Sequence, residues 1–183
     1  MSRSSTSRAK PGKARPPAKS AGIVSSSHLV SPRSVELSEF EFGLIVAWNA
    51  FSRWAMRCMA AAGRGDLAIT DVLVLHHVNH RARNKKLADI CFVLNYEDTH
   101  VVAYALKKLL AAGLVSAEKQ GKEVFYSPTP EGEALVERYR EVRETCLMDS
   151  FDAELNHDIG AHARLLRSMS GMYDQAARAA SSL

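Results

Sequence analysis

Apolar side chains recur every three or four positions along most of the chain after residue 33, which is the spacing of amphipathic α-helices. The first such stretch is the most apolar, contains two Trp and three Phe, and ends at the glycines of Gly63-Arg-Gly65. Helices are expected over residues 34–62, 71–79, 87–94, 99–112 and 129–156, with a last helix after a break at 158–160.

Local capping signals support these helix boundaries. Asn95 can adopt the left-handed conformation that ends a helix, and Gly113 occupies the usual position just past a helix end. Side chains that can accept a hydrogen bond from the first turn, together with proline, mark the starts. The expected start signals are Thr70, Asp98 or Thr99, and Thr129 followed by Pro130.

The periodicity changes once, after Gly113. Residues 114–119 and 122–127 are two short β-prone runs around Gln120-Gly121, which predicts a tight hairpin. Helix, short helix, helix and hairpin is the order of elements in a winged helix-turn-helix. The predicted fold class is therefore mainly α with a small β-hairpin wing, between long N- and C-terminal helices.

Several residue runs resemble the MarR-type winged-helix regulators. These runs are Leu87-Ala-Asp-Ile90 leading to Leu94, Val102 to Leu106, and Ala111-Ala-Gly-Leu-Val115. The resemblance implies a transcriptional regulator that binds double-stranded DNA sequence-specifically as a homodimer joined through its terminal helices. The hairpin is shorter than is usual in that family and lacks its Asp-x-Arg pair, so this part is more similar to an ArsR-type wing.

Four regions are expected along the chain. Residues 1–33 are predicted to be a disordered basic tail, and residues 34–66 an N-terminal dimerisation helix. Residues 67–128 are the expected winged helix-turn-helix DNA-binding domain, and residues 129–183 the C-terminal dimerisation helices. Two copies of helix 99–112 would then read successive major grooves of a pseudo-palindromic site.

The helix over 99–112 has the composition of a DNA-reading helix. Its inward face is expected to be Val102, Ala105, Leu106 and Leu109, which leaves polar side chains on the opposite face. An α-helix fits the major groove, where such side chains reach base edges. The expected base-reading residues are Thr99, His100, Tyr104 and Lys107. The expected phosphate-binding residues are Arg83, Lys108, Lys119 and Lys122.

The charge is divided unevenly along the chain. Residues 1–33 carry seven of the 24 Lys and Arg residues and no Asp or Glu, whereas the rest carries 17 cations against 20 anions. The pI of about 9.0 therefore belongs to the tail rather than to the folded body. A basic arm of this kind raises affinity for DNA without adding sequence information. A tail without a dedicated role and a targeting segment are the alternatives.

Other function classes lack their signatures. There is no long apolar stretch for a membrane span, and three scattered cysteines favour a reducing, cytoplasmic location, on the nucleoid when DNA is bound. No G-x-S-x-G, P-loop or G-x-G-x-x-G motif is present, so we expect no enzyme and no cofactor. The alternative function is a winged-helix protein–protein interaction module, because Glu97 and Asp98 would repel phosphate.

Three groups leave smaller hypotheses open. His76, His77 and His80 have a spacing seen in metal sites, but no third ligand is visible and we expect no metal. Cys91 is either a redox switch or a small buried hydrophobe. One aromatic and methionine group either lines a pocket for a small-molecule effector or is ordinary core packing. Its members are Trp48, Trp54, Met56 and Met59.

Overall fold

The computed structural model describes residues 30–31, 33–80, 84–148, 151 and 153–183. The expected disordered tail lies almost wholly outside these residues, and so does Arg83. The chain divides into two compact units, residues 1–49 and residues 50–183. The first helix runs through both of them, and all the elements after it belong to the second.

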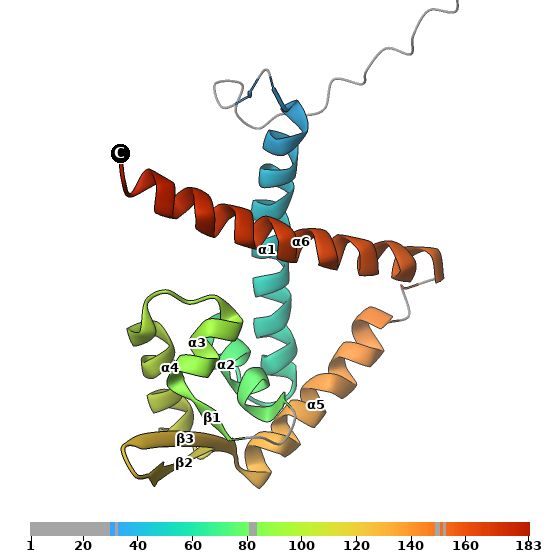
Figure 1. Ribbon diagram of the computed structural model, residues 1–183. Coiled ribbons are helices and arrows are strands. Elements are labelled where there is room, and N and C mark those ends of the chain that lie inside the picture. The colour runs from blue at the N-terminus through green and yellow to red at the C-terminus, as the bar shows by residue number, and fades with distance from the viewer. Residues whose placement is uncertain (1–29, 32, 81–83, 149–150, 152) are drawn as a thin grey trace, which may run out of the picture. The chain divides into compact units, whose positions relative to one another are not determined.

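Helices make up most of the second unit, and a small sheet lies beside them (Figure 1). The described elements in chain order are α1 (Val35–Ala61), α2 (Ile69–Asn79), β1 (Lys85–Lys86), α3 (Leu87–Leu94), α4 (Thr99–Ala111), β2 (Val115–Gln120), β3 (Glu123–Pro128), α5 (Pro130–Leu147) and α6 (Ala153–Ala180).

Most predicted helix ends are confirmed by their backbone geometry. Asn95 ends α3 with φ at 56°, in the left-handed region, and Gly113 follows α4 with φ at 71°. The Asp98 carboxylate caps α4 by accepting a hydrogen bond from the backbone N–H of His100 at 2.9 Å. Thr129 caps α5, its Oγ1 accepting from the Gly132 N–H at 3.1 Å.

The prediction that Thr70 caps the second helix is wrong. Ala68 is the N-cap residue and α2 already begins at Ile69. Alanine has no side-chain oxygen to accept from the first turn. The side-chain bond at this helix start runs in the opposite direction, since the Asp71 carboxylate accepts a hydrogen bond from the Ala68 N–H at 2.8 Å. Thr70 instead shares a hydrogen bond with the Tyr96 hydroxyl at 3.2 Å, from α2 to the α3–α4 turn.

The predicted break near residues 158–160 is also wrong. The helix that starts at Pro130 ends at Leu147, and Asp158 and Gly160 lie inside α6. A single glycine in a helix costs only about 1 kcal/mol, which the flanking helical residues outweigh. Glycine was therefore a poor stop signal at this position.

The sheet has three strands in the order β1-β3-β2, all antiparallel. The hairpin is confirmed with a shift of one residue, since Gln120 pairs with Glu123 and the turn is Gly121-Lys122. Gly121 has φ at 64°, a conformation that favours glycine. The strand Lys85–Lys86, which pairs with Phe125 and Tyr126, was not among the predicted elements.

One hydrophobic core holds α2, α3 and α4 together with the ends of α1 and α5. The predicted inward face of α4 is confirmed, because Val102, Ala105, Leu106 and Leu109 are all buried. They pack with fully buried side chains from the neighbouring elements, including Met59, Leu75, Ile90, Leu114 and Leu135. This packing fixes which face of α4 is left to solvent.

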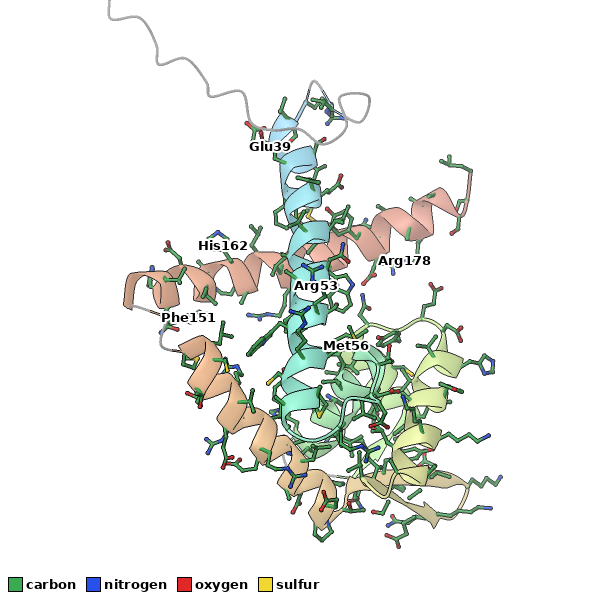
Figure 2. All side chains as sticks on the ribbon, turned by 180° about the vertical axis from the view of Figure 1, so that it is seen from behind. Glu39, Arg53, Met56, Phe151, His162 and Arg178 are labelled. Carbon is green, nitrogen blue, oxygen red and sulfur yellow. The ribbon has the colours of Figure 1, made fainter. Side chains whose placement is uncertain are left out.

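The last helix differs from these core elements because it keeps large apolar side chains at its surface. Ile159, Leu165, Leu166 and Met172 are all more than two-fifths exposed. Polar residues such as His162 and Arg178 lie on the same helix (Figure 2). The side-chain amide of Asn95, at the end of α3, donates hydrogen bonds to Ser170 and Asp174 of α6, both at 3.3 Å.

Candidate nucleic-acid interface

The solvent face of α4 presents the side chains that were expected to read bases. Thr99, His100, Tyr104 and Lys107 are all exposed, and Tyr104 is 72% exposed. His100, Tyr104 and Lys107 follow one another at steps of four and three residues, so they share one face of the helix. That face lies opposite the buried one, because the apolar positions are occupied by core contacts.

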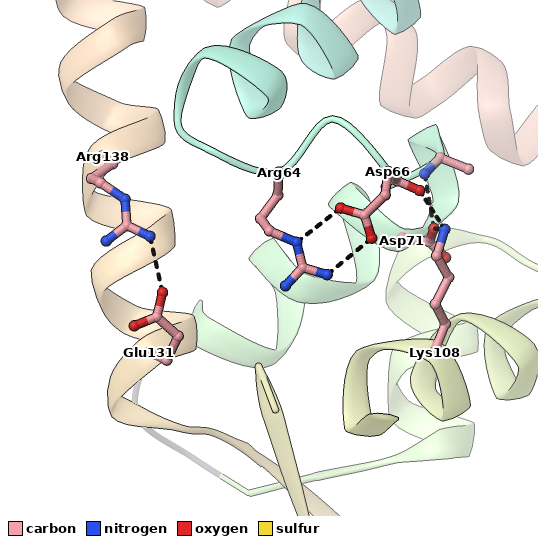
Figure 3. Close-up of polar contacts among 7 residues, drawn as sticks. Arg64, Asp66, Asp71, Lys108, Glu131 and Arg138 are labelled. Carbon is pink, nitrogen blue, oxygen red and sulfur yellow. Dashed lines mark hydrogen bonds and ion pairs between the residues drawn. The ribbon is translucent and has the colours of Figure 1, made fainter. Parts of the chain in front are cut away.

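Lys108 has a different environment from its neighbour Lys107. Its ammonium donates to the Asp66 backbone carbonyl at 2.6 Å and to the Asp71 carboxylate at 2.7 Å (Figure 3). The Asp71 side chain is 4% exposed, whereas that of Lys108 is 33% exposed. The pair fastens α4 to the N-terminus of α2. The role of Lys108 as a phosphate contact stays a prediction. Its ammonium already bonds two oxygens within the chain, and a phosphate would have to compete with them.

The loop between α1 and α2 is held by further ion pairs (Figure 3). The Arg64 guanidinium makes two hydrogen bonds to Asp66, at 2.8 and 2.9 Å. These bonds lower the pKa of the Asp66 carboxyl to about 2. Arg138 of α5 donates to the Ala62 carbonyl and pairs with Glu131. The loop that bonds Lys108 is thus itself anchored to α5.

The hairpin tip carries two of the expected phosphate-binding cations. Lys119 and Lys122 are both exposed. The nearby Glu123 is paired with Lys86 of β1 at 2.6 Å, and the Lys86 ammonium lies 5.4 Å from the centre of the Phe125 ring. This pair offsets an acidic charge at the base of the tip. The sequence alone did not indicate the pair between Lys86 and Glu123, because this pair forms only when β1 pairs with β3.

Comparison with known proteins identifies the fold. Residues 67–132 match a family model described as winged helix DNA-binding domain. No curated protein matches the chain. Residues 67–132 form a winged helix-turn-helix. The predicted fold class is confirmed.

Solved structures support the same fold over most of the chain. AbfR of Staphylococcus epidermidis is 18% identical, with a TM-score of 0.62 over 74% of this chain and 92% of AbfR. Reduced AbfR bound to DNA gives a TM-score of 0.63. A MarR transcriptional regulator from Methanosarcina mazei Go1 is 16% identical, with a TM-score of 0.60 over 72% of this chain and 96% of that one. Bordetella bronchiseptica BpsR, whose DNA binding is regulated by 6-hydroxynicotinic acid, is 22% identical, with a TM-score of 0.51 over 69% and 91%.

The histidines of α2 were considered as possible metal ligands, and the structure shows the surroundings of His76. No cluster of three metal-ligating side chains occurs among the described residues. His76 packs edge-on against Tyr139 of α5, with ring centres 4.4 Å apart. Its Nε2 is buried and has no hydrogen-bond partner in the described part of the chain. Burial lowers the pKa of His76, as it does that of His77.

The lowered pKa of His76 predicts a loss of stability in acid. The unfolded chain takes up a proton near pH 6.5 that the folded chain resists, so the free energy of unfolding falls as the pH drops below that value. Replacing His76 with phenylalanine keeps the ring contact and removes this proton, so stability should depend less on pH between 8 and 5. Urea unfolding across that range measures it. An unchanged slope in the variant would contradict the assignment.

Two of the thiols, one on α1 and one on α3, lie in the core. Cys91 and Cys58 are buried, and burial raises the pKa of both. The Cys58 thiol also donates to the Tyr139 carbonyl at 3.4 Å. Because a thiolate is the reactive species, these surroundings favour the interpretation of Cys91 as a small buried hydrophobe.

The aromatic and methionine group of α1 differs in burial from one member to the next. Met59 is fully buried in the core, Trp54 packs partly buried against it, and Met56 is 36% exposed. Trp48 lies in the other unit, residues 1–49. Core packing accounts for Met59 and Trp54 without an effector.

Proposed function

We propose that this protein is a sequence-specific, double-stranded DNA-binding transcriptional regulator that acts as a homodimer. The observation that carries the proposal is the exposed face of α4, where His100, Tyr104 and Lys107 lie together on a helix braced by α2 and α3. Such a helix matches the width of the major groove. AbfR, whose fold this chain shares, has been solved bound to DNA.

The proposal divides the work between base reading and phosphate binding. His100, Tyr104, Lys107 and Thr99 contact base edges, and Lys119 and Lys122 of the hairpin contact the backbone. Arg83 lies outside the described residues and remains a proposed phosphate contact on sequence grounds alone. Lys108 is chiefly a positioning residue in this scheme, since its ion pair with Asp71 holds α4 in place.

This division predicts different effects from different substitutions. Lys122→Ala should weaken binding to all duplexes alike. It should also reduce the slope of log affinity against log salt concentration by about one, the contribution of one phosphate contact. His100→Ala and Tyr104→Ala should change the preferred sequence, each by about 1–3 kcal/mol at the contacted base pair. Selection from a randomised duplex pool followed by anisotropy titration measures both. Identical sequence preferences in the three variants would contradict the division.

The homodimer is proposed on the apolar faces of the terminal helices. Phe42, Ile45 and Val46 of α1 are exposed, and Leu165 and Leu166 of α6 are exposed as well. Large apolar patches on a soluble chain mark interaction surfaces. Two α4 helices, one from each copy, would then enter major grooves about one helical turn apart.

Charging the α6 face should separate the two copies. Leu166→Glu is expected to shift the protein from dimer to monomer at micromolar concentration, because a carboxylate would be buried in the interface without a partner. Ser168→Glu, at an exposed polar position of the same helix, should leave the dimer intact. Sedimentation velocity distinguishes the two. A wild-type monomer at that concentration would refute the dimer and the paired-groove scheme.

A small-molecule effector is a further part of the proposal. A cavity of about 370 Å³ lies between α2 and α5, lined by His76, Val136, Tyr139, Arg140 and Arg143. BpsR shows that a regulator with this fold can respond to an organic acid. Release of DNA on adding 6-hydroxynicotinic acid to wild type, but not to Val136→Trp, would support an effector here. No release from either would count against it.

The location and the absence of catalysis are proposed on the same basis. Among the described residues, no helix combines the length and apolar composition that a membrane span requires. The fold is that of transcription regulators. We propose a non-catalytic role, carried out in the cytoplasm and on the nucleoid when DNA is bound.

A further inference from the structure

A shallow groove lies beside the proposed base-reading face. It measures about 540 Å³ and runs between the N-terminus of α2 and the flank of α4. Hydrocarbon groups from Ala68, Val101, Tyr104 and Ala105 line it. Val101 is 39% exposed, although it follows His100 directly and precedes Tyr104 by one helical turn. The groove therefore opens on the same side of α4 as the proposed DNA contacts.

Three of the polar side chains that line this groove, those of Asp71, Asp98 and Thr70, are bonded within the chain. Asp71 is occupied by Lys108 and by the Ala68 N–H. The Asp98 carboxylate accepts from the His100 N–H, and the Thr70 hydroxyl is bonded to Tyr96. The Lys108 ammonium is already bonded to Asp66 and Asp71. The groove therefore offers a ligand mainly apolar surface, with the His100 side chain and the two carboxylates nearby, and this surface fits an uncharged apolar group.

We propose that Val101 and Tyr104 form a receptor for the C5-methyl group of thymine, so that Val101 determines base specificity. Thymine alone among the four bases presents a methyl group in the major groove. The inference rests on the proposed function, because α4 must enter that groove for the contact to form. The sequence alone does not indicate that a single valine on a helix surface contacts a base. The role of Val101 is inferred from its place in the groove beside Tyr104.

Replacing thymine with deoxyuridine tests the proposal. Deoxyuridine keeps every hydrogen-bonding group of thymine and lacks the methyl group. The full-length chain is first used to select its preferred duplex from a randomised pool, and each thymine of one half-site is then exchanged in turn. At the contacted position, affinity should fall about fourfold, the effect of removing one buried methyl group from the interface.

The variant Val101→Ala should bind the thymine and deoxyuridine duplexes about equally at that position. Val93→Ala is the matched control, because Val93 is an exposed valine of α3 that does not line the groove. It should keep the wild-type preference for thymine. Both valines are well exposed, so neither change should disturb folding.

The outcomes separate this inference from the function on which it rests. If no duplex is enriched by selection, the proposed function fails. If a duplex is enriched but deoxyuridine binds as tightly as thymine at every position, the methyl receptor is overturned and the proposed function stands. A full thymine preference in Val101→Ala would overturn the assignment of Val101.

Discussion

Replacing Gly132 with alanine is expected to lower the free energy of unfolding by about 3 kcal/mol, a severe case of core overpacking. A β-carbon at this position would lie 2.0 Å from the Leu114 carbonyl oxygen and 3.0 Å from its carbonyl carbon. Both atoms belong to the backbone just before β2, so no side-chain rotation relieves the clash. The first turn of α5 or the base of the hairpin must move instead.

The local bonding makes that movement costly. The Leu114 carbonyl accepts from the Thr129 N–H at 3.2 Å. The Thr129 hydroxyl donates to the Gly113 carbonyl at 2.6 Å and accepts from the Gly132 N–H. Displacing α5 would therefore break several hydrogen bonds at the junction of helix and hairpin.

Gly160→Ala provides the control for this prediction. Gly160 lies inside α6, and a β-carbon added there would meet nothing within 4 Å, so alanine should stabilise the helix by roughly 0.5–1 kcal/mol. Urea unfolding of the two variants beside wild type measures both effects. Equal stability of Gly132→Ala and Gly160→Ala would mean that the close approach of α5 to Leu114 is not a feature of the folded protein.

Two adjacent lysines of α4 should give opposite results when each is replaced with alanine. Lys108→Ala leaves the Asp71 carboxylate, which is 4% exposed, without its cation. Removing one partner from a buried pair costs about 3–5 kcal/mol, and the partial exposure of Lys108 reduces this to about 2–3 kcal/mol. Lys107→Ala removes an exposed cation and should change stability by less than about 0.5 kcal/mol.

DNA affinity separates the same two variants. Lys107→Ala should weaken specific binding in a protein that melts at the wild-type temperature. The melting temperature of Lys108→Ala should fall by roughly 5–10 °C. The double variant Asp71→Asn and Lys108→Met should recover part of that loss, because no buried charge is then left unpaired. Equal melting temperatures for wild type and Lys108→Ala would contradict the role of the ion pair.

Local signals were enough to predict much of the fold. The helix over Leu87–Leu94 was expected with the bounds that the structure has, because Asn95 and the apolar spacing act within a few residues. Thr129 and Pro130 marked the start of α5 in the same way. Lys85–Lys86 was missed as a strand because its partner residues, Phe125 and Tyr126, lie about 40 positions further along the chain.

The candidate site shows the same limit. Helical spacing placed His100, Tyr104 and Lys107 correctly on the exposed face of α4. Spacing could not show that Lys108 bonds Asp71, which is 37 positions away. Nor could it indicate the groove beside Val101, because α2 forms the opposite side. Contacts between distant segments decide which cations are available to DNA and which hold the domain together.

The central claim is that the folded body reads DNA sequence through α4, and one binding measurement tests it most directly. The full chain is titrated against the DNA upstream of its own gene and against a scrambled duplex, over a series of salt concentrations. A second version, with the seven cations of residues 1–33 replaced by glutamine, is titrated in parallel.

We predict a preference for the upstream DNA over the scrambled duplex. This preference should survive both moderate salt and the loss of those seven cations. Equal binding to both duplexes, steep in salt and lost with the tail cations, would contradict it. That outcome would mean counterion release by the tail alone, and the winged helix would then be better explained as a protein-binding module.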